Sequence, residues 1–316
     1  MEIGVLDLGS TTFHLQHIRI DEKAQFSTTW DEKRSLCLGA QVFADGYLDR
    51  RSWIEGLTAA EQLLTTSQEQ KPDHIAVVAT SAIRTASNGV RFAEELRRRQ
   101  HVAVRVLESH DEARLAYLGQ STSPLVGGRR VAVVDLGGGS VELAVGEGIR
   151  CLHAASLPLG AVRMRATHAG EQYTSRDAAQ LARVIRHEAG PQLRAVRDLA
   201  PEIVVFGSGS ARAARKLLMR DTRLPGKLGP IDATEFRMRL EGLFDCSPAQ
   251  LIELGVEPAR ASTVLVAATI ILQILDALAV PNALVSDKGL RDGVALEVYR
   301  ELAALRRVDT RAAALA

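Results

Sequence analysis

Three short turns combine glycines with hydroxyl side chains, and each directly follows an apolar, β-rich run of residues. They lie at 9–11, 137–140 and 207–210. Glycine lets the backbone approach an anion closely, and consecutive N–H groups form a nest that suits phosphate oxygens. The third turn also opens a predicted helix, whose N-terminus favours negative charge. We therefore expect a phosphate site with these contacts: Ser10, Thr11, Gly137, Gly138, Gly139, Ser140, Gly207, Ser208, Gly209 and Ser210.

Carboxylates accompany two of these turns. Asp7 and Asp135 lie at the ends of the preceding strands, and Glu142 follows Asp135 by seven residues. Acids beside a phosphate cradle suit Mg²⁺, because the cation bridges carboxylate and phosphate oxygens. The structural alternatives are turn capping for the two aspartates and a solvent-facing strand position for Glu142. Our expectation is that Asp7, Asp135 and Glu142 bind the metal.

Two further side chains could take part in chemistry. Glu112 follows Ser109 by three residues, a spacing typical of a capping box, which on motif grounds favours a structural role. The alternative is a general base that orients water for attack on phosphorus. Arg84, in TSAIRTASN, could clamp phosphate oxygens, although surface arginines are usually only solvated. Arg163 and Arg291 could add positive charge to a groove.

Two segments of the chain look like copies of one another. IGVLDLGSTTFHL begins at residue 3, and VAVVDLGGGSVEL begins at residue 131. Superposing Asp7 on Asp135 aligns the glycine turns, and it places His14 where the second copy has Glu142. A repeated strand–turn–strand unit predicts a duplicated fold whose halves differ chemically.

Strands alternate with helices between and after the copies, which predicts an α/β fold. The expected strands are 74–80, 102–107 and 203–207, and the expected helices are 52–70, 90–99, 109–119 and 175–200. The segment STSPLVGGRR at 121–130 is typical of a domain boundary. We therefore expect domains at 1–122 and 123–316, with a helix at about 294–308 able to pack back on the first.

Composition excludes some classes of protein. The 316 residues carry 39 basic and 38 acidic side chains, a net charge of +1, so neither nucleic acid nor a membrane is expected as a partner. Three distant cysteines favour a reducing compartment, and no signal peptide precedes the first strand, so we expect a cytoplasmic protein. The apolar run Val264–Val280 contains Gln273 and Asp276, which fits a buried helix better than a membrane span.

Several motifs in order along the chain resemble the exopolyphosphatase / guanosine pentaphosphate phosphohydrolase family. They are DLGST, TSAIRTASN, EARL, DLGGGSVEL, SLPLGAVR, GSGSARA and GLRDG. The resemblance implies duplicated actin-like ATPase (ribonuclease H-like) domains with an active-site cleft between them. It also implies Mg²⁺-dependent hydrolysis of terminal phosphate from polyphosphate or from guanosine pentaphosphate.

The resemblance assigns roles to individual residues. Glu112 matches the family's catalytic glutamate, and Arg84 matches its substrate-contacting arginine. Asp135 and Glu142 match the acids linked to metal and phosphate, and 137–140 matches the phosphate loop. Thr11 and Thr12 replace a common Asn-Ser pair, and Thr85 replaces a common acid. The sequence has no counterpart of the C-terminal helical domain of long relatives, which favours short polyphosphate chains.

We therefore expect a Mg²⁺-dependent exopolyphosphatase that acts on short chains with Glu112 as the base. The alternatives are a guanosine pentaphosphate phosphohydrolase, which aromatic residues at 4% mildly disfavour, and a sugar- or acetate-kinase-like enzyme. A further alternative is a non-catalytic sensor of polyphosphate or of guanosine tetra- and pentaphosphate. A homodimer is left open.

Overall fold

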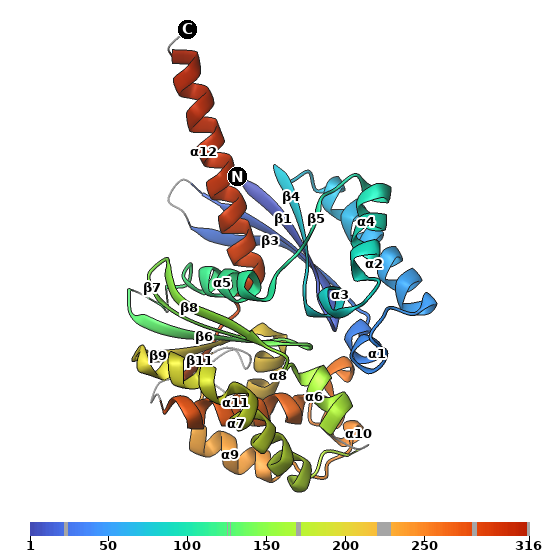
Figure 1. The fold of residues 1–316 in the computed structure, drawn as a ribbon, viewed down its shortest axis with the longest axis vertical. Helices are drawn as coiled ribbons and strands as arrows, with labels where there is room; N and C mark the ends of the chain where they lie inside the picture. Colours follow the sequence, from blue (N-terminus) through green and yellow to red (C-terminus); the bar gives the residue numbers. More distant parts are fainter. Residues whose placement is uncertain are drawn as a thin grey trace.

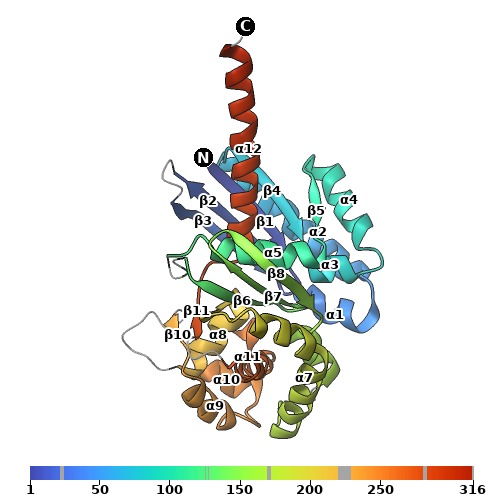
Figure 2. The same ribbon diagram turned by 60° about the vertical axis from the view of Figure 1, so that its left-hand side comes forward.

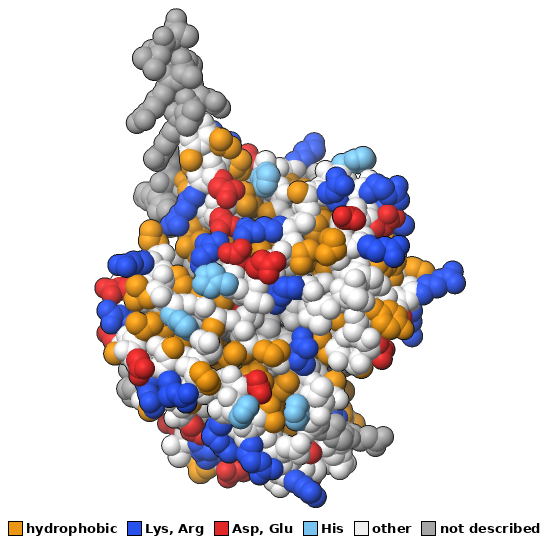
Figure 3. All heavy atoms as spheres, viewed as in Figure 1, with side chains coloured by type: hydrophobic (Ala, Val, Ile, Leu, Met, Phe, Trp, Pro, Cys, Tyr) orange, Lys and Arg blue, Asp and Glu red, His pale blue; other side chains and the backbone are white. Residues whose placement is uncertain are grey.

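A computed structural model describes residues 1–21, 25–124, 126, 128–168, 172–219, 229–279 and 283–314, with side chains to residue 306. Leu125, Gly127 and Val280, which belong to segments interpreted above, lie outside these residues. Two β-sheets, each with helices packed on it, make up the molecule (Figure 1). Basic and acidic side chains are interspersed over the face shown in Figure 3.

The first sheet has the order β3-β2-β1-β4-β5. Its strands are β1 (Glu2–Leu8), β2 (Thr12–Ile20), β3 (Phe26–Ser35), β4 (His74–Ala79) and β5 (Val104–Val106). The first three strands form an antiparallel meander, while β4 and β5 run parallel to β1. The sequence did not predict β3, because its charged and mostly exposed residues lack an apolar alternation.

The second sheet has the order β10-β11-β9-β6-β7-β8. Its strands are β6 (Arg130–Leu136), β7 (Val141–Glu147), β8 (Arg150–Leu157), β9 (Ile203–Gly207), β10 (Gly229–Pro230) and β11 (Ala283–Val285). Strands β6 to β8 form an antiparallel meander, and β9 and β11 run parallel to β6.

The two sheets share one topology, which confirms the predicted duplication. The order 3-2-1-4-5 of the first sheet recurs as 8-7-6-9-11 in the second, with the same strand directions. The register agrees too, because Asp7 lies opposite His14 and Asp135 lies opposite Glu142. The molecule therefore has the duplicated arrangement of the actin-like ATPase fold.

Helices cover the outer faces of both sheets. On the first sheet they are α1 (Leu38–Asp45), α2 (Arg50–Glu69), α3 (Ser81–Thr85) and α4 (Gly89–Gln100). The second half of the molecule has α6 (Ala161–His168), α7 (Ser175–Asp198), α8 (Ser208–Leu218), α9 (Ala233–Glu241), α10 (Pro248–Glu253), the 3₁₀ turn η1 (Pro258–Arg260) and α11 (Val264–Leu278). Of these, α7 and α8 contact the strands directly, and α9 packs on α8 and α11.

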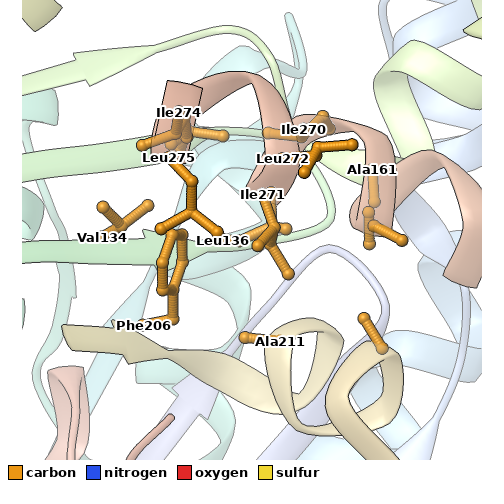
Figure 4. Packing of buried hydrophobic residues seen from close by; sticks show 14 of the residues in the cluster. Val134, Leu136, Ala161, Phe206, Ala211, Ile270, Ile271, Leu272, Ile274 and Leu275 are labelled. Atoms are coloured by element: carbon orange, nitrogen blue, oxygen red, sulfur yellow. The ribbon is translucent and has the colours of Figure 1, made fainter. Parts of the chain in front are cut away.

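The apolar helix α11 is core, as the sequence predicted. Its Ile271 and Leu275 belong to the same buried cluster as Leu136 of β6 and Phe206 of β9 (Figure 4). Among the described residues, no helix has the length and apolar character needed to cross a membrane.

Two helices lie between the sheets: α5 (Ser109–Gln120) and the start of α12 (Leu290–Ala314) (Figures 1 and 2). Helix α5 contacts β7 and β8 of the second sheet, and α12 packs on α5 and on β1 of the first. The segment expected to return to the first half is therefore α12, whereas the domain limits at 122/123 stay a prediction.

Candidate active site

A cavity lies where the ends of the two sheets meet, and it collects most of the predicted site residues. Its walls come from the turns after β1, β6 and β9 and from the segment that leads into α12. The predicted residues that line it are Asp7, Ser10, Thr11, Glu112, Asp135, Gly137, Gly138, Gly139, Ser140, Glu142, Ser208, Gly209 and Ser210. Arg84 and Gly207 do not line this cavity.

The turns after β1 and β6 touch each other across the two halves. A Cβ atom on Gly138 would lie 2.6 Å from Thr11 Oγ1, and one on Gly139 would lie 2.5 Å from Ser81 Oγ and 2.9 Å from Ser10 Oγ. Glycine is therefore required at both positions by the close approach of side chains from the first half of the molecule. The predicted phosphate residues of the two copies face one shared space.

Helix α6 holds the second turn in place. The backbone N–H groups of Ala161 and Val162 donate to the carbonyls of Gly137 and Gly138, at 3.0 and 2.8 Å. Arg163 Nε donates to the carbonyl of Gly139 at 2.9 Å, and its guanidinium lies 4.0 Å from the centre of the Phe43 ring. Arg163 thus braces the phosphate turn from behind and does not line the cavity.

The third turn combines a helix N-terminus with an unusual backbone conformation. Gly207 is the N-cap of α8, and Ser208 has φ of 82°, in the left-handed region that favours glycine. Such conformations often mark functional sites. Gly207 lies behind the cavity, where an added Cβ would be 3.6 Å from Asp135 Cγ. It lies opposite Asp135 in the β6–β9 pairing, whereas Ser208, Gly209 and Ser210 face the cavity.

The predicted capping box at Ser109 and Glu112 is wrong. Helix α5 begins at Ser109 with Glu108 as the N-cap residue, and no side chain caps it. Because Ser109 is already helical, its hydroxyl does not have the position that a capping box requires. The Glu112 side chain turns into the cavity, where the residue is only 7% exposed.

Arg84 is the partner of Glu112. Its Nη1 donates to Glu112 Oε2 at 2.6 Å and to the carbonyl of Leu107 at 2.7 Å. Burial raises the pKa of Glu112 to about 7, with the Arg84 charge opposing this and the Asp7 and Asp135 charges adding to it. A carboxyl with a pKa near neutral pH suits a group that accepts a proton. Direct contact of Arg84 with substrate stays a prediction.

Three further acids share this environment, with Glu142 buried and Asp7 and Asp135 partly buried. Burial raises the pKa of Asp7 to about 6, against the attraction of Arg291, whose Nη1 lies 3.4 Å from Asp7 Oδ2. Burial also raises the pKa of Asp135, opposed by Arg291 and Arg212. The pKa of Glu142 lies well above its usual value because of burial and the nearby Glu112 and Asp135 charges.

The donor set fits a magnesium ion that is bound jointly with substrate. Within the described ranges, no three His, Cys, Asp or Glu side chains converge closely enough to hold a metal alone. Mg²⁺ usually binds one or two carboxylates together with waters and substrate phosphates. Asp7 Oδ1 is buried without a hydrogen-bond partner. The Asp7 carboxyl lies near that of Asp135, and burial raises the pKa of both carboxyls. A divalent cation would offset this concentration of acids.

Several cations of the cavity were not predicted from the sequence. Lys33, Arg212, Arg260 and Lys288 line it together with Arg291. Arg212 lies in GSGSAR, where proximity to a phosphate turn was an available signal. Lys33 and Arg260 come from an exposed strand and from η1, and no motif surrounds either of them.

Comparison with known proteins gives a consistent assignment. Residues 18–302 match the model of the Ppx/GppA phosphatase family. An exopolyphosphatase from Cytophaga hutchinsonii is similar in structure, with a TM-score of 0.85, 22% identity, and 94% of this chain and 97% of that chain covered. An Aquifex aeolicus Ppx/GppA family member gives a TM-score of 0.79 at 26% identity, over 95% of this chain and 98% of that chain. The chain belongs to the Ppx/GppA phosphatase family.

Proposed function

We propose that this protein is an exopolyphosphatase that removes terminal phosphate from short inorganic polyphosphate. The observation that carries the proposal is the buried Glu112 carboxyl, with a pKa of about 7, facing a cavity whose walls include three glycine- and hydroxyl-rich turns. Membership of a phosphatase family and a structural neighbour described as an exopolyphosphatase support it. The preference for short chains rests on the sequence resemblance.

The end of the polyphosphate substrate is held by backbone and hydroxyl groups of the protein. The terminal phosphate lies among the turns at 9–11, 137–140 and 208–210, and Arg291 and Arg212 offset its charge. Mg²⁺ held by Asp7 and Asp135, with Glu142 nearby, would stabilise the charge that develops on the phosphate oxygens.

Glu112 activates the attacking water. Its ionised carboxylate accepts a proton as the water oxygen bonds to the terminal phosphorus. The bridging P–O bond breaks on the opposite side, and the electron pair leaves with the shortened chain. Arg84 acts as a positioning residue, because it fixes one Glu112 oxygen and lowers the pKa of the carboxyl.

Phosphate release by the purified protein with Mg²⁺ tests the proposal. Short polyphosphate, long polyphosphate and guanosine pentaphosphate are compared, and Glu112→Gln is run beside the wild type. We expect release from short chains and a loss of about 10²–10⁴-fold in the variant, the usual range for a general base. No release from any substrate by folded protein would refute the hydrolase and favour the sensor. Preferential release from guanosine pentaphosphate, with polyphosphate as a competitor, would favour the alternative substrate.

The stability of Glu112→Gln separates a catalytic role from a structural one. Because the folded pKa of about 7 exceeds the usual 4.5, ionising Glu112 destabilises the fold as pH rises between these values. Glutamine removes that penalty and can still accept the Arg84 hydrogen bond. The variant should therefore melt at pH 8 no lower than the wild type. An earlier melting transition with unchanged turnover per folded molecule would show that Glu112 is structural.

A further inference from the structure

A second cavity adjoins the catalytic one on the side of α8. The two share the wall formed by Lys33, Gly209, Arg212 and Arg260. Beyond this wall the second cavity is lined by Lys216 of α8 and by the segment at 254–257, which precedes η1. The two cavities are therefore neighbours, and the Arg212 and Arg260 side chains lie between them.

The shared wall concentrates positive charge. The Arg260 guanidinium packs so closely on Gly209 that a Cβ there would overlap it, and its Nη1 lies 3.4 Å from Ser210 Oγ. Arg212 Nη1 donates to the carbonyl of Ser286 at 3.4 Å. Each guanidinium group therefore has a neutral oxygen as a hydrogen-bond partner at the boundary between the cavities.

On the side of the second cavity, little negative charge balances these cations. Among the described residues lining the second cavity, Glu257 is the one acid, and its half-exposed carboxylate lies 3.6 Å from Arg260 Nε. Burial lowers the pKa of Arg212, and the charges of Arg291 and Arg260 lower it further, while the charges of Asp135 and Asp287 oppose this. Like charges held together out of water favour an anionic ligand that relieves their repulsion.

A lysine extends the cationic surface to the outer end of the cavity. Lys216 is exposed on α8, two turns after the phosphate turn, and its Nζ donates to the carbonyl of Gly255 at 3.0 Å. Lys33 approaches from β3 of the first half of the molecule. The cations thus form a path that begins at the catalytic cavity and leads outward, which suits a linear polyanion better than a single phosphate.

We infer that the second cavity is the subsite for the phosphate groups behind the terminal one, with Arg260 and Lys216 contacting the chain that is released. The inference rests on the proposed function. It makes these two side chains determinants of chain length, because a substrate of two or three phosphates ends within the first cavity, and longer ones reach the second.

Steady-state kinetics with polyphosphates of defined length test the inference. In Lys216→Gln and Arg260→Gln, we expect KM for chains of about ten phosphates to rise about 10-fold, the effect of one charge-assisted hydrogen bond. KM and kcat for tripolyphosphate should change less than 2-fold in Lys216→Gln. Lys71→Gln removes the same charge from an exposed turn before β4 and should match the wild type at every length.

The outcomes are separable. An equal change of KM for tripolyphosphate and for the longer chain in Lys216→Gln, or no change in either variant, would overturn the subsite. Tighter inhibition by a guanosine nucleotide than by a polyphosphate of equal charge, weakened in both variants, would assign the cavity to a nucleoside and also overturn it. If the wild type hydrolyses nothing, the proposed function fails. Calorimetric binding of the ten-phosphate chain would then test the subsite by itself. Weaker binding by Lys216→Gln than by the wild type supports the subsite, and equal binding overturns it.

Discussion

At the scale of single residues, the site is defined by how Arg84 and Glu112 balance each other. Burial raises the pKa of the carboxyl and the guanidinium lowers it, with a result near neutral pH. A base with a much higher pKa would be protonated in the working enzyme, and one with a much lower pKa would be a weak proton acceptor. The ion pair therefore tunes Glu112 as well as orienting it.

Arg84→Gln should move the pH dependence of the reaction. Removing the guanidinium removes the charge that lowers the pKa of Glu112, so the pKa rises above its present value of about 7. The acidic limb of kcat/KM should therefore move to higher pH, and a limb displaced by about one pH unit lowers the rate at pH 6 by about tenfold. Pre-steady-state or steady-state profiles from about pH 5.5 to about pH 9 measure this.

Arg84→Lys keeps the charge but loses the planar fork, and its profile should lie between those of the wild type and Arg84→Gln. A uniform loss of rate at all pH values, with the limb unmoved, would show that Arg84 acts on substrate alone.

At the scale of elements, the crossing of α5 and α12 positions the two sides of the site. A Cβ on Gly293 would overlap the backbone carbonyl of Leu115, and one on Gly119 would overlap that of Gly289. The backbones of the two helices therefore meet directly. Since α5 carries Glu112 and α12 carries Arg291, this contact sets the distance between the base and the cation beside Asp7.

Gly293→Ala should force the two helices apart. Overpacking of this kind costs about 1–3 kcal/mol of folding stability, and it should also lower kcat by displacing Glu112. Thermal unfolding and phosphate release measure both effects.

Gly242→Ala is the matched control. Its Cβ would meet backbone oxygens at 3.6 Å and 3.7 Å, in ordinary contact, and at φ of −72° the change should be neutral or slightly stabilising. Equal melting temperatures for Gly293→Ala and the wild type would refute the helix contact.

At the scale of the whole molecule, the duplication brings two similar aspartates together from opposite halves. Asp7 and Asp135 are the second-last residues of β1 and β6, and the Asp135 charge contributes to the raised pKa of Asp7 in the shared cavity. A cation that binds both acids therefore connects the two sheets. Ligand binding should for this reason stabilise the protein as one unit.

Mg²⁺ should raise the melting temperature more at pH 8 than at pH 5.5. Asp7, with a pKa of about 6, is mostly protonated at the lower pH and must lose its proton to bind a metal. At one hundred times the dissociation constant, the expected gain in unfolding free energy is about 2.7 kcal/mol.

Sodium chloride at equal ionic strength serves as the control for charge screening, and Asp135→Asn should abolish the rise in melting temperature that Mg²⁺ causes. If Mg²⁺ raised the melting temperature of Asp135→Asn as much as that of the wild type, or equally at both pH values, metal binding at these acids would be contradicted.

The sequence by itself determined the duplicated fold and most of the cavity's wall. Apolar strands that end in Asp-Leu-Gly carry local information, because a glycine turn after a buried strand can be recognised without its partners. The alignment of Asp7 with Asp135 and of His14 with Glu142 was therefore predictable, and the residue pairing of β1 with β2 and of β6 with β7 confirms it. The apolar run that became α11 was predictable for the same reason.

Only the tertiary structure decided what the charged side chains contact. The spacing of Ser109 and Glu112 predicted a helix cap, yet Glu112 pairs with Arg84 from 28 residues earlier in the chain. Arg163 was expected to add positive charge to a groove, and instead its Nε donates to the carbonyl of Gly139. Lys33 and Arg260 reach the cavity from β3 and η1, and no local sequence pattern predicts that they line the same cavity. Charge–charge contacts depend on which segments the fold brings together, and that information is not present in any single stretch of the chain.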